Sequence, residues 1–143
     1  MTLNPNRPPL VVGVTGGRVY RHREVVRLVL DTLAPTLVRH GACSSGADRF
    51  ASDWCREHDV AEDRHPAHWS QHGKAAGPYR NGTMAKLAAD LWVAFPGGPG
   101  TANMVRQADV AGHRVVRIPR GSFLTADAHP IFAELRPAPP RFL

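Results

Sequence analysis

Short apolar runs alternate along the chain with longer stretches in which apolar residues recur at the spacing of an amphipathic helix. Such runs, bounded by turn residues, are typical of buried strands, and they occur at 10–14, 37–43, 60–65, 90–95 and 113–118. Helical spacing is found at 22–33, 44–58, 79–88 and 102–111, and more briefly at 129–135. The 66–77 stretch follows neither pattern and is expected to be an irregular loop.

This alternation predicts a Rossmann-like α/β fold, with a mostly parallel sheet of about five strands and helices on both faces. Sheets of this kind bind ligands outside the carboxyl ends of their strands, near the point where the strand order reverses. Two glycine-rich turns are expected at such ends. They are Thr15-Gly16-Gly17, the 15–17 turn, and Pro96-Gly97-Gly98-Pro99-Gly100-Thr101, the 96–101 loop. Their coincidence there predicts a ligand site.

The length of 143 residues predicts a single folded domain. We expect a flexible N-terminal segment over 1–9, the Rossmann-like domain over 10–119, and a C-terminal extension over 120–143 that packs on the body or on a partner subunit. No apolar run approaches the roughly 20 residues that span a bilayer, so we expect no membrane contact and a cytoplasmic location. Cys43 and Cys55 are then expected to be free thiols.

The formal net charge of +6 favours anionic partners, either nucleic acid or the phosphate of a nucleotide. The basic residues are scattered along the chain, which is more typical of a solvated surface than of a nucleic-acid-binding patch. Nucleic acid therefore stays an alternative partner, supported by charge alone.

The 96–101 loop has the properties of a phosphate-binding turn. Its glycines allow a ligand to approach the backbone without meeting a Cβ atom. The helix that follows presents unpaired N–H groups and the positive end of its dipole, and Thr101 can cap that helix or bond a phosphate. A tight turn without a ligand is the alternative. The loop lacks the lysine of a P-loop, and Gly13-Val14-Thr15-Gly16-Gly17 is not a dinucleotide fingerprint, so neither triphosphate hydrolysis nor dehydrogenase chemistry is expected.

Charged side chains near the two turns supply further candidates. Arg80 is suited to pair with a phosphate through two N–H groups of its guanidinium, and Arg18 directly follows the 15–17 turn. Lys74 lies in a glycine-flanked segment that can close over a ligand. Asp48 can contact a ribose, act as a base, or cap its helix together with Ser44 or Ser45.

Aromatic and histidine side chains cluster between 65 and 79. Trp69 and Tyr79 can stack on a base or serve in packing. A metal site there would use three histidines near Asp63, namely His65, His68 and His72. The run contains no cysteine ligand and Pro66 stiffens it, so we expect no bound metal.

Several of these segments together resemble the SLOG superfamily, and within it the small YspA-like branch. The resemblance rests on 14–18, on Gly41-Ala42-Cys43-Ser44-Ser45-Gly46-Ala47-Asp48, on 72–81 and on 95–103, and it covers about 10–119. It implies a Rossmann-like fold that binds nucleotides or their derivatives, and a homo-oligomer, namely a dimer. The apolar residues of the C-terminal extension that can bury such an interface are Ile131, Phe132, Phe142 and Leu143.

The superfamily includes the "lonely guy" phosphoribohydrolases, which release a base from a nucleoside monophosphate. Arg80-Asn81-x-x-Met84 is similar to their arginine-bearing helix, and the 96–101 loop is similar to their P-G-G-x-G-T-x-E-E loop, whose glutamate serves the cleavage together with the arginine. Asn103 and Met104 stand at the two glutamate positions here. An amide stabilises oxocarbenium-like charge much less well than a carboxylate, and it cannot act as a base.

We therefore expect a protein that binds or senses a nucleotide or a nucleotide-derived small molecule, without a cofactor. A hydrolase of nucleotide N-glycosidic bonds is the alternative, with Arg80 and Asp48 as catalytic residues, and a nucleic-acid-binding protein is the second alternative. The expected ligand-binding residues are Gly16, Gly17, Arg18, Ser45, Gly46, Lys74, Arg80, Asn81, Pro96, Gly97, Gly98, Gly100, Thr101 and Asn103.

Overall fold

The computed structural model describes residues 8–125 and 129–135 and contains one five-stranded sheet. Its strands are β1 (Val11–Thr15), β2 (Leu37–His40), β3 (Ala61–Arg64), β4 (Leu91–Ala94) and β5 (Val115–Arg117). They lie in the order β3-β2-β1-β4-β5, and every neighbouring pair is parallel. The prediction of a Rossmann-like α/β fold is confirmed.

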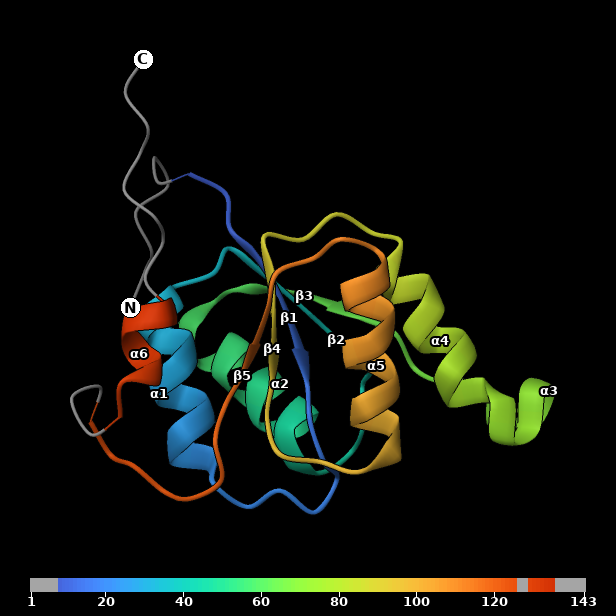
Figure 1. Ribbon diagram of the computed structural model, residues 1–143, viewed down its shortest axis with the longest axis horizontal. Helices are drawn as coiled ribbons and strands as arrows, with labels where there is room; N and C mark the ends of the chain where they lie inside the picture. The colour runs from blue at the N-terminus through green and yellow to red at the C-terminus, as the bar shows by residue number, and fades with distance from the viewer. Residues whose placement is uncertain (1–7, 126–128, 136–143) are drawn as a thin grey trace.

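Helices cover both faces of this sheet (Figure 1). On one face lie α1 (Arg23–Leu33), α2 (Gly46–His58) and the short α6 (Ile131–Leu135). On the other face α4 (Ala76–Ala85) packs against α5 (Pro99–Val110). The short α3 (Trp69–His72) and the 3₁₀ turn η1 (Gly73–Ala75) project beyond α4. Because every pair of neighbouring strands is parallel, the carboxyl ends of the strands lie at one edge of the sheet, and the turns that follow β1 and β4 lie at the bottom of Figure 1.

The hydrophobic core has two parts because the sheet is buried on both faces. The larger part joins α1, α2 and α6 to the sheet, and the smaller part joins Met84, Trp92, Met104 and Ala108 between the sheet and the α4–α5 pair. Gly13 allows the Trp92 ring to lie against β1, since a Cβ atom at Gly13 would stand 2.2 Å from that ring.

Two helices begin earlier than the sequence pattern predicts, and part of the expected 66–77 loop is helical. The expected starts at 79 and 102 are wrong, because α4 begins at Ala76 and α5 at Pro99. The physical reason is that Pro78 and Pro99 occupy first turns, where a missing N–H breaks no helical hydrogen bond. Proline is compatible with the first position of a helix, as at Pro99, and with the first turn, as at Pro78.

The described part of the C-terminal extension packs on the body of the chain. Residues Ile131 and Phe132 of α6 are buried, and α6 contacts α1. These two side chains therefore pack within the chain, on its body, which is one of the two places expected for the extension. Phe142, Leu143 and most of the expected flexible 1–9 segment lie outside the described residues.

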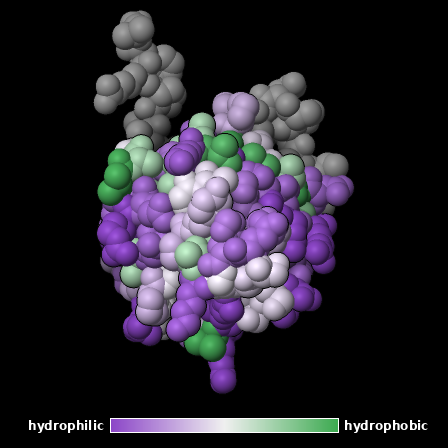
Figure 2. Space-filling model, turned by 90° about the vertical axis from the view of Figure 1, so that its right-hand side faces the viewer, coloured by the Kyte–Doolittle hydropathy of each residue, from purple (hydrophilic) through white to green (hydrophobic). Residues whose placement is uncertain are grey.

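Two further observations concern the surface. On the face that α3 and α4 form, hydrophobic residues lie in small separate groups among hydrophilic ones (Figure 2). Within residues 8–125 and 129–135, no helix is both long and apolar enough to cross a membrane.

Candidate functional site

The two glycine-rich turns meet at the carboxyl ends of β1 and β4. The backbone N–H of Gly17 donates to the carbonyl of Pro96 at 3.0 Å, which ties the 15–17 turn to the 96–101 loop. The strand order reverses between β1 and β4, and this is where open α/β sheets bind ligands. A cleft of about 1010 Å³ opens there, lined by both turns and by α4 and α5.

The glycines of this region fall into two groups by their surroundings. Three of them are required by packing. At Gly16 a Cβ atom would stand 2.6 Å from the Cβ of Ala47, and at Gly46 it would stand 2.0 Å from the Gly17 carbonyl oxygen. At Gly97 it would stand 2.1 Å from the Thr101 hydroxyl. Gly98 and Gly100 differ, because a Cβ atom at either position would meet nothing within 4 Å among the described residues. Both line the cleft.

The N-terminus of α5 opens onto the same space. Its N-cap residue is Gly98, and no side chain within the described part of the chain caps it. The first-turn N–H groups therefore remain for water or a ligand, and the positive end of the dipole favours an anion. Thr101 and Asn103 also line the cleft beside this helix end.

Arg80, on α4, is held by backbone carbonyls. Its Nη1 donates to the carbonyls of Gly41 at 2.6 Å and His65 at 3.1 Å, and its Nε donates to the amide oxygen of Asn81 at 2.9 Å. Nη2 makes no hydrogen bond within residues 8–125 and 129–135, and the residue lines the cleft. Part of the guanidinium is therefore structural, and part remains for a ligand.

The amides of Asn81 and Asn103 join α4 to α5. Asn81 Nδ2 donates to Asn103 Oδ1 at 3.1 Å and to the Gly100 carbonyl at 3.3 Å. Gln107 Nε2 also donates to Asn103 Oδ1, at 2.8 Å. The oxygen of Asn103 is thus committed to donors from the protein, while Met104 beside it is buried in the core.

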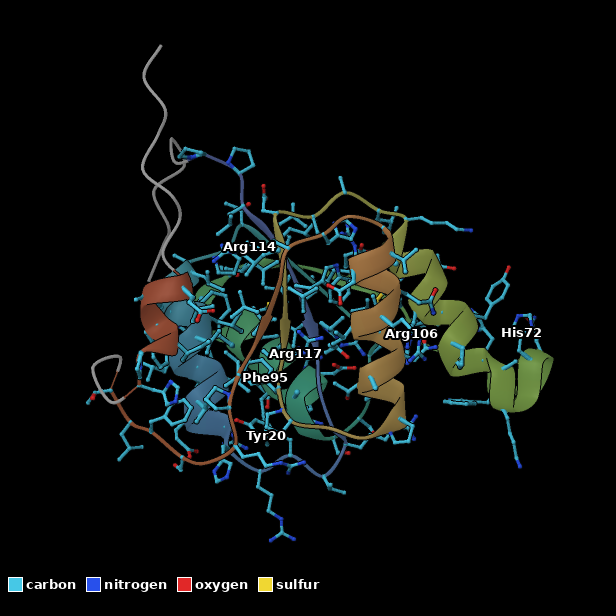
Figure 3. The ribbon with its side chains drawn as sticks, in the orientation of Figure 1. Tyr20, His72, Phe95, Arg106, Arg114 and Arg117 are labelled. Carbon is cyan, nitrogen blue, oxygen red and sulfur yellow. The ribbon has the colours of Figure 1, made fainter. Side chains whose placement is uncertain are left out.

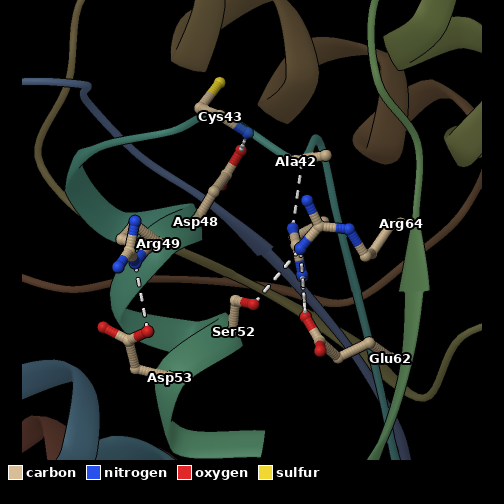
Figure 4. Close-up of polar contacts among 9 residues, drawn as sticks. Ala42, Cys43, Asp48, Arg49, Ser52, Asp53, Glu62 and Arg64 are labelled. Carbon is tan, nitrogen blue, oxygen red and sulfur yellow. Dashed lines mark hydrogen bonds and ion pairs between the residues drawn. The ribbon is translucent and has the colours of Figure 1, made fainter. Parts of the chain in front are cut away.

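Asp48 and Cys43, which come after β2 in the chain, line one wall of the cleft. Figure 4 shows how the two residues lie. Asp48 is buried in the first turn of α2, and its Oδ2 accepts the Cys43 N–H at 3.3 Å. Burial, together with the Asp48 carboxylate, raises the pKa of the Cys43 thiol, so this thiol is protonated near neutral pH. The Asp48 carboxylate lies close to Arg80, because a Cβ atom at Gly41 would stand 2.4 Å from Arg80 Nη1 and 3.1 Å from Asp48 Oδ2.

Of the remaining predicted residues, Arg18, Trp69 and Lys74 line the cleft, whereas Ser45 and Tyr79 are not among its lining residues. The guanidinium of Arg18 lies 5.5 Å from the centre of the Trp69 ring, a cation–π contact, and both residues line the cleft with Lys74. Ser45 does not cap α2, because its hydroxyl donates to the Arg18 carbonyl at 2.9 Å. Tyr79 stacks on His72 with ring centres 4.6 Å apart.

A buried histidine supports the loop that follows β2. His40 is fully buried; its Nδ1 accepts the Ala42 N–H at 3.0 Å and its Nε2 lies 2.9 Å from Glu62 Oε1. This pairing holds Ala42 at a φ of +57°, in the left-handed region that favours glycine. The bend that results aims the Gly41 carbonyl at Arg80. Figure 4 shows Glu62 and Arg64 on the β3 side of this cluster.

We predict that Glu62→Gln makes the stability of the protein less sensitive to acid. Burial raises the pKa of Glu62, but hydrogen bonds from Ser52 and His40 and the charges of His40 and Arg64 outweigh it, so the pKa lies below its ordinary 4.5. Ionised Glu62 therefore stabilises the fold above about pH 4.5, and this contribution is lost as the pH falls through the folded-state pKa.

The difference is measured by urea unfolding of the wild type and of Glu62→Gln between pH 3 and 6, with about one unfolding curve for each half pH unit. The variant should be less stable than the wild type at pH 6 and should converge on it toward pH 3. Glu134→Gln, at an exposed position of α6, is the control and should follow the wild-type curve. Parallel curves for Glu62→Gln and the wild type would contradict the prediction.

Several further residues line the cleft, and none of them was predicted from the sequence. Arg106 follows Asn103 by one helical turn on α5, and this spacing is the signal that identifies it. Arg120 reaches the cleft from the segment after β5, and only the fold brings it there. Tyr20 contributes a buried hydroxyl without a partner in the described residues; burial and the Glu24 charge raise its pKa to about 12, so it remains a donor (Figure 3).

The histidines near α3 serve other contacts. His65 lies 2.9 Å from Asp63, and His72 stacks on Tyr79. Within residues 8–125 and 129–135, no group of three or more His, Cys, Asp or Glu side chains is placed to hold a metal ion.

The sheet and its crevice define a Rossmann-like α/β domain with a ligand-sized cleft at the point where the strand order reverses. The chain belongs to the YspA, cpYpsA-related SLOG family, whose model (YAcAr) matches residues 10–72. It is 36% identical over 118 residues to the Gene 61 protein of Mycobacterium phage D29, a match that covers 72% of this chain and 91% of that protein. The resemblance seen in the sequence is confirmed.

The fold is also similar to that of a solved structure, the Moco Carrier Protein from Chlamydomonas reinhardtii. The two structures agree with a TM-score of 0.54 at 16% sequence identity, over 90% of this chain and 85% of the other. The likeness is one of fold. Membership of this family supports nucleotide or small-molecule binding at a coarse level.

Proposed function

We propose that the chain binds a nucleotide-derived small molecule, with a phosphate of the ligand against the N-terminus of α5. The observation that carries the proposal is the open space at Gly98 and Gly100. The protein itself needs a glycine at Gly16, Gly46 and Gly97 for packing, but nothing in the described residues would meet a side chain at the other two positions. Space kept free beside an uncapped helix start is what a bound anion requires.

The charges and rings around the cleft support the same assignment. Arg18, Lys74 and Arg106 bring positive charge to its walls, which suits a phosphate. Trp69 is about half exposed and lines the cleft, so its ring can stack on a base. The fold neighbour is by its name a carrier of Moco, which fits the proposal that this cleft also holds a small molecule.

Binding is favoured over cleavage by the surroundings of Asn103. Its oxygen already accepts hydrogen bonds from Asn81 and Gln107, so the position that corresponds to a glutamate in the phosphoribohydrolases serves here to join two helices. Asp48 is the carboxylate that a hydrolase would have to use, and one of its oxygens accepts the Cys43 N–H. Cleavage by Asp48 and Arg80 remains the second hypothesis, and release of free base from nucleoside monophosphates, lost in Asp48→Asn, would support it.

The binding proposal is tested with Gly100→Leu. Leucine is a better helix former than glycine, so the folded state should be at least as stable as the wild type. The side chain would enter the cleft, so we expect the affinity for the best-bound nucleotide to fall about tenfold or more, which is about 1.4 kcal/mol.

Calorimetric titration with the common nucleoside 5′-monophosphates and ADP-ribose identifies that nucleotide and measures the loss. Ala111→Leu, at an exposed position near the other end of α5, is the control and should bind as the wild type does. If Gly100→Leu binds the nucleotide as tightly as the wild type does, the assignment of the phosphate to this helix end is wrong. If the wild type binds none of these nucleotides, the proposed function is wrong.

A further inference from the structure

A second hollow lies beside the cleft, on the other side of the 96–101 loop. It has a volume of about 610 Å³ and lies between α5 and β5. Its floor is apolar and formed by buried side chains, among them Ala94, Val105 and Ile118. An apolar floor of this size suits a ring system rather than a second inorganic anion.

The hollow and the cleft share one wall. Pro96, Gly97, Gly98 and Thr101 line both, so the 96–101 loop forms a ridge between them. The cleft reaches toward β2 through Gly41 and Cys43, and the hollow lies over the carboxyl ends of β4 and β5. The two spaces therefore cover opposite halves of the sheet, on either side of the point where the strand order reverses.

Positive charge surrounds this ridge. Arg106 on α5 and Arg120 line both spaces, and Arg117 on β5 lines the second (Figure 3). Within residues 8–125 and 129–135, no carboxylate lies within 4.0 Å of the guanidinium of Arg106 or Arg120, whereas Arg117 lies 3.7 Å from Asp109. Two arginines without an ion-pair partner, at a loop that both spaces share, can contact the oxygens of two linked phosphates.

We infer that the ligand has two arms joined through a pyrophosphate, which crosses the 96–101 loop, and that the second arm is a ring system in the hollow between α5 and β5. This inference rests on the proposed function. A nucleoside monophosphate would fill the cleft alone and leave the apolar floor exposed to water. A dinucleoside 5′,5′-diphosphate covers both spaces and places its bridge against the helix start and the arginines.

The test compares each nucleoside 5′-monophosphate with the dinucleoside 5′,5′-diphosphate built from the same nucleoside. The wild type should bind the diphosphate at least tenfold more tightly. Ala102→Trp should remove this gain and leave the affinity for the monophosphate unchanged, because Ala102 is exposed and lines only the second hollow. The matched control is Ala111→Trp, at the C-cap of the same helix and outside both spaces, and it should retain the gain.

A charge variant tests the same site without adding bulk. Arg117 is 68% exposed, so Arg117→Glu should leave the fold intact and weaken binding of the diphosphate several-fold, with little effect on the monophosphate. Equal affinities of the wild type for the two ligands, or an equal loss of both in Ala102→Trp, would overturn the inference while leaving the proposed function in place. If neither ligand binds the wild type, the proposed function itself fails.

Discussion

Replacing Gly46 by alanine is expected to lower the free energy of unfolding by about 3 kcal/mol or more. Gly46 is the first residue of α2 and has a φ of +74°. An added Cβ atom would stand 2.0 Å from the Gly17 carbonyl oxygen and 2.7 Å from the Arg18 Cα, both of them backbone atoms. A flexible side chain can move away from such a clash, but here the 15–17 turn itself must move.

Chemical denaturation of Gly46→Ala beside Gly112→Ala separates the two causes of this loss. Gly112 also has a positive φ, of +88°, but a Cβ atom there would meet nothing within 4 Å. Gly112→Ala therefore carries the backbone strain alone, about 1 kcal/mol. Equal losses in the two variants would show that the contact with Gly17 is unimportant. Because that contact supports the cleft, Gly46→Ala should also weaken nucleotide binding.

Replacing Arg80 by methionine is expected to cost about 3 kcal/mol of stability and to weaken nucleotide binding at least tenfold. Its Nη1 bonds the carbonyls of Gly41 and His65, which follow β2 and β3, so the side chain ties α4 to two strand ends. Methionine retains much of the apolar volume but leaves both carbonyls without this donor. Loss of Nη2 removes the part of the guanidinium that remains for a ligand.

Lys74→Met is the control for Arg80→Met. Lys74 is exposed and lines the cleft, so its replacement should change the free energy of unfolding by less than about 0.5 kcal/mol. Urea unfolding and calorimetric titration of both variants measure the two effects separately. Unchanged stability in Arg80→Met would contradict the structural role, and unchanged affinity would contradict the role in binding.

The sheet and the place of the site follow from local patterns that the sequence shows plainly. The apolar runs of β1 and β4 end in glycine-rich turns, and parallel pairing necessarily brings those turns to one edge. Other features depend on contacts between distant residues. The polar residues Arg39 and His40 interrupt the apolar run of β2, yet both are buried, because Arg39 pairs with Asp63 at 2.6 Å and His40 with Glu62 at 2.9 Å. No local pattern reveals such partners in advance.

The roles of individual site residues were the hardest to predict. An arginine near a glycine-rich loop is a reasonable phosphate ligand, but only the fold shows that Arg80 donates to two backbone carbonyls. The same holds for Asn103, whose oxygen is used between α4 and α5. The hollow beside the 96–101 loop arises where α5 passes over β5, so no single stretch of sequence encodes it.

The hydrogen bond from Gly17 to Pro96 and the close packing of Gly46 on the 15–17 turn join the segments that follow β1, β2 and β4 into one closely packed frame. A ligand that enters the cleft would therefore meet a surface already in its bound geometry. Little chain entropy would be lost on association, and the association rate would not wait on loop closure. Ligands of such a frame would then differ mainly in how fast they dissociate. A ligand with the wrong shape would dissociate quickly, because the frame does not adapt to it.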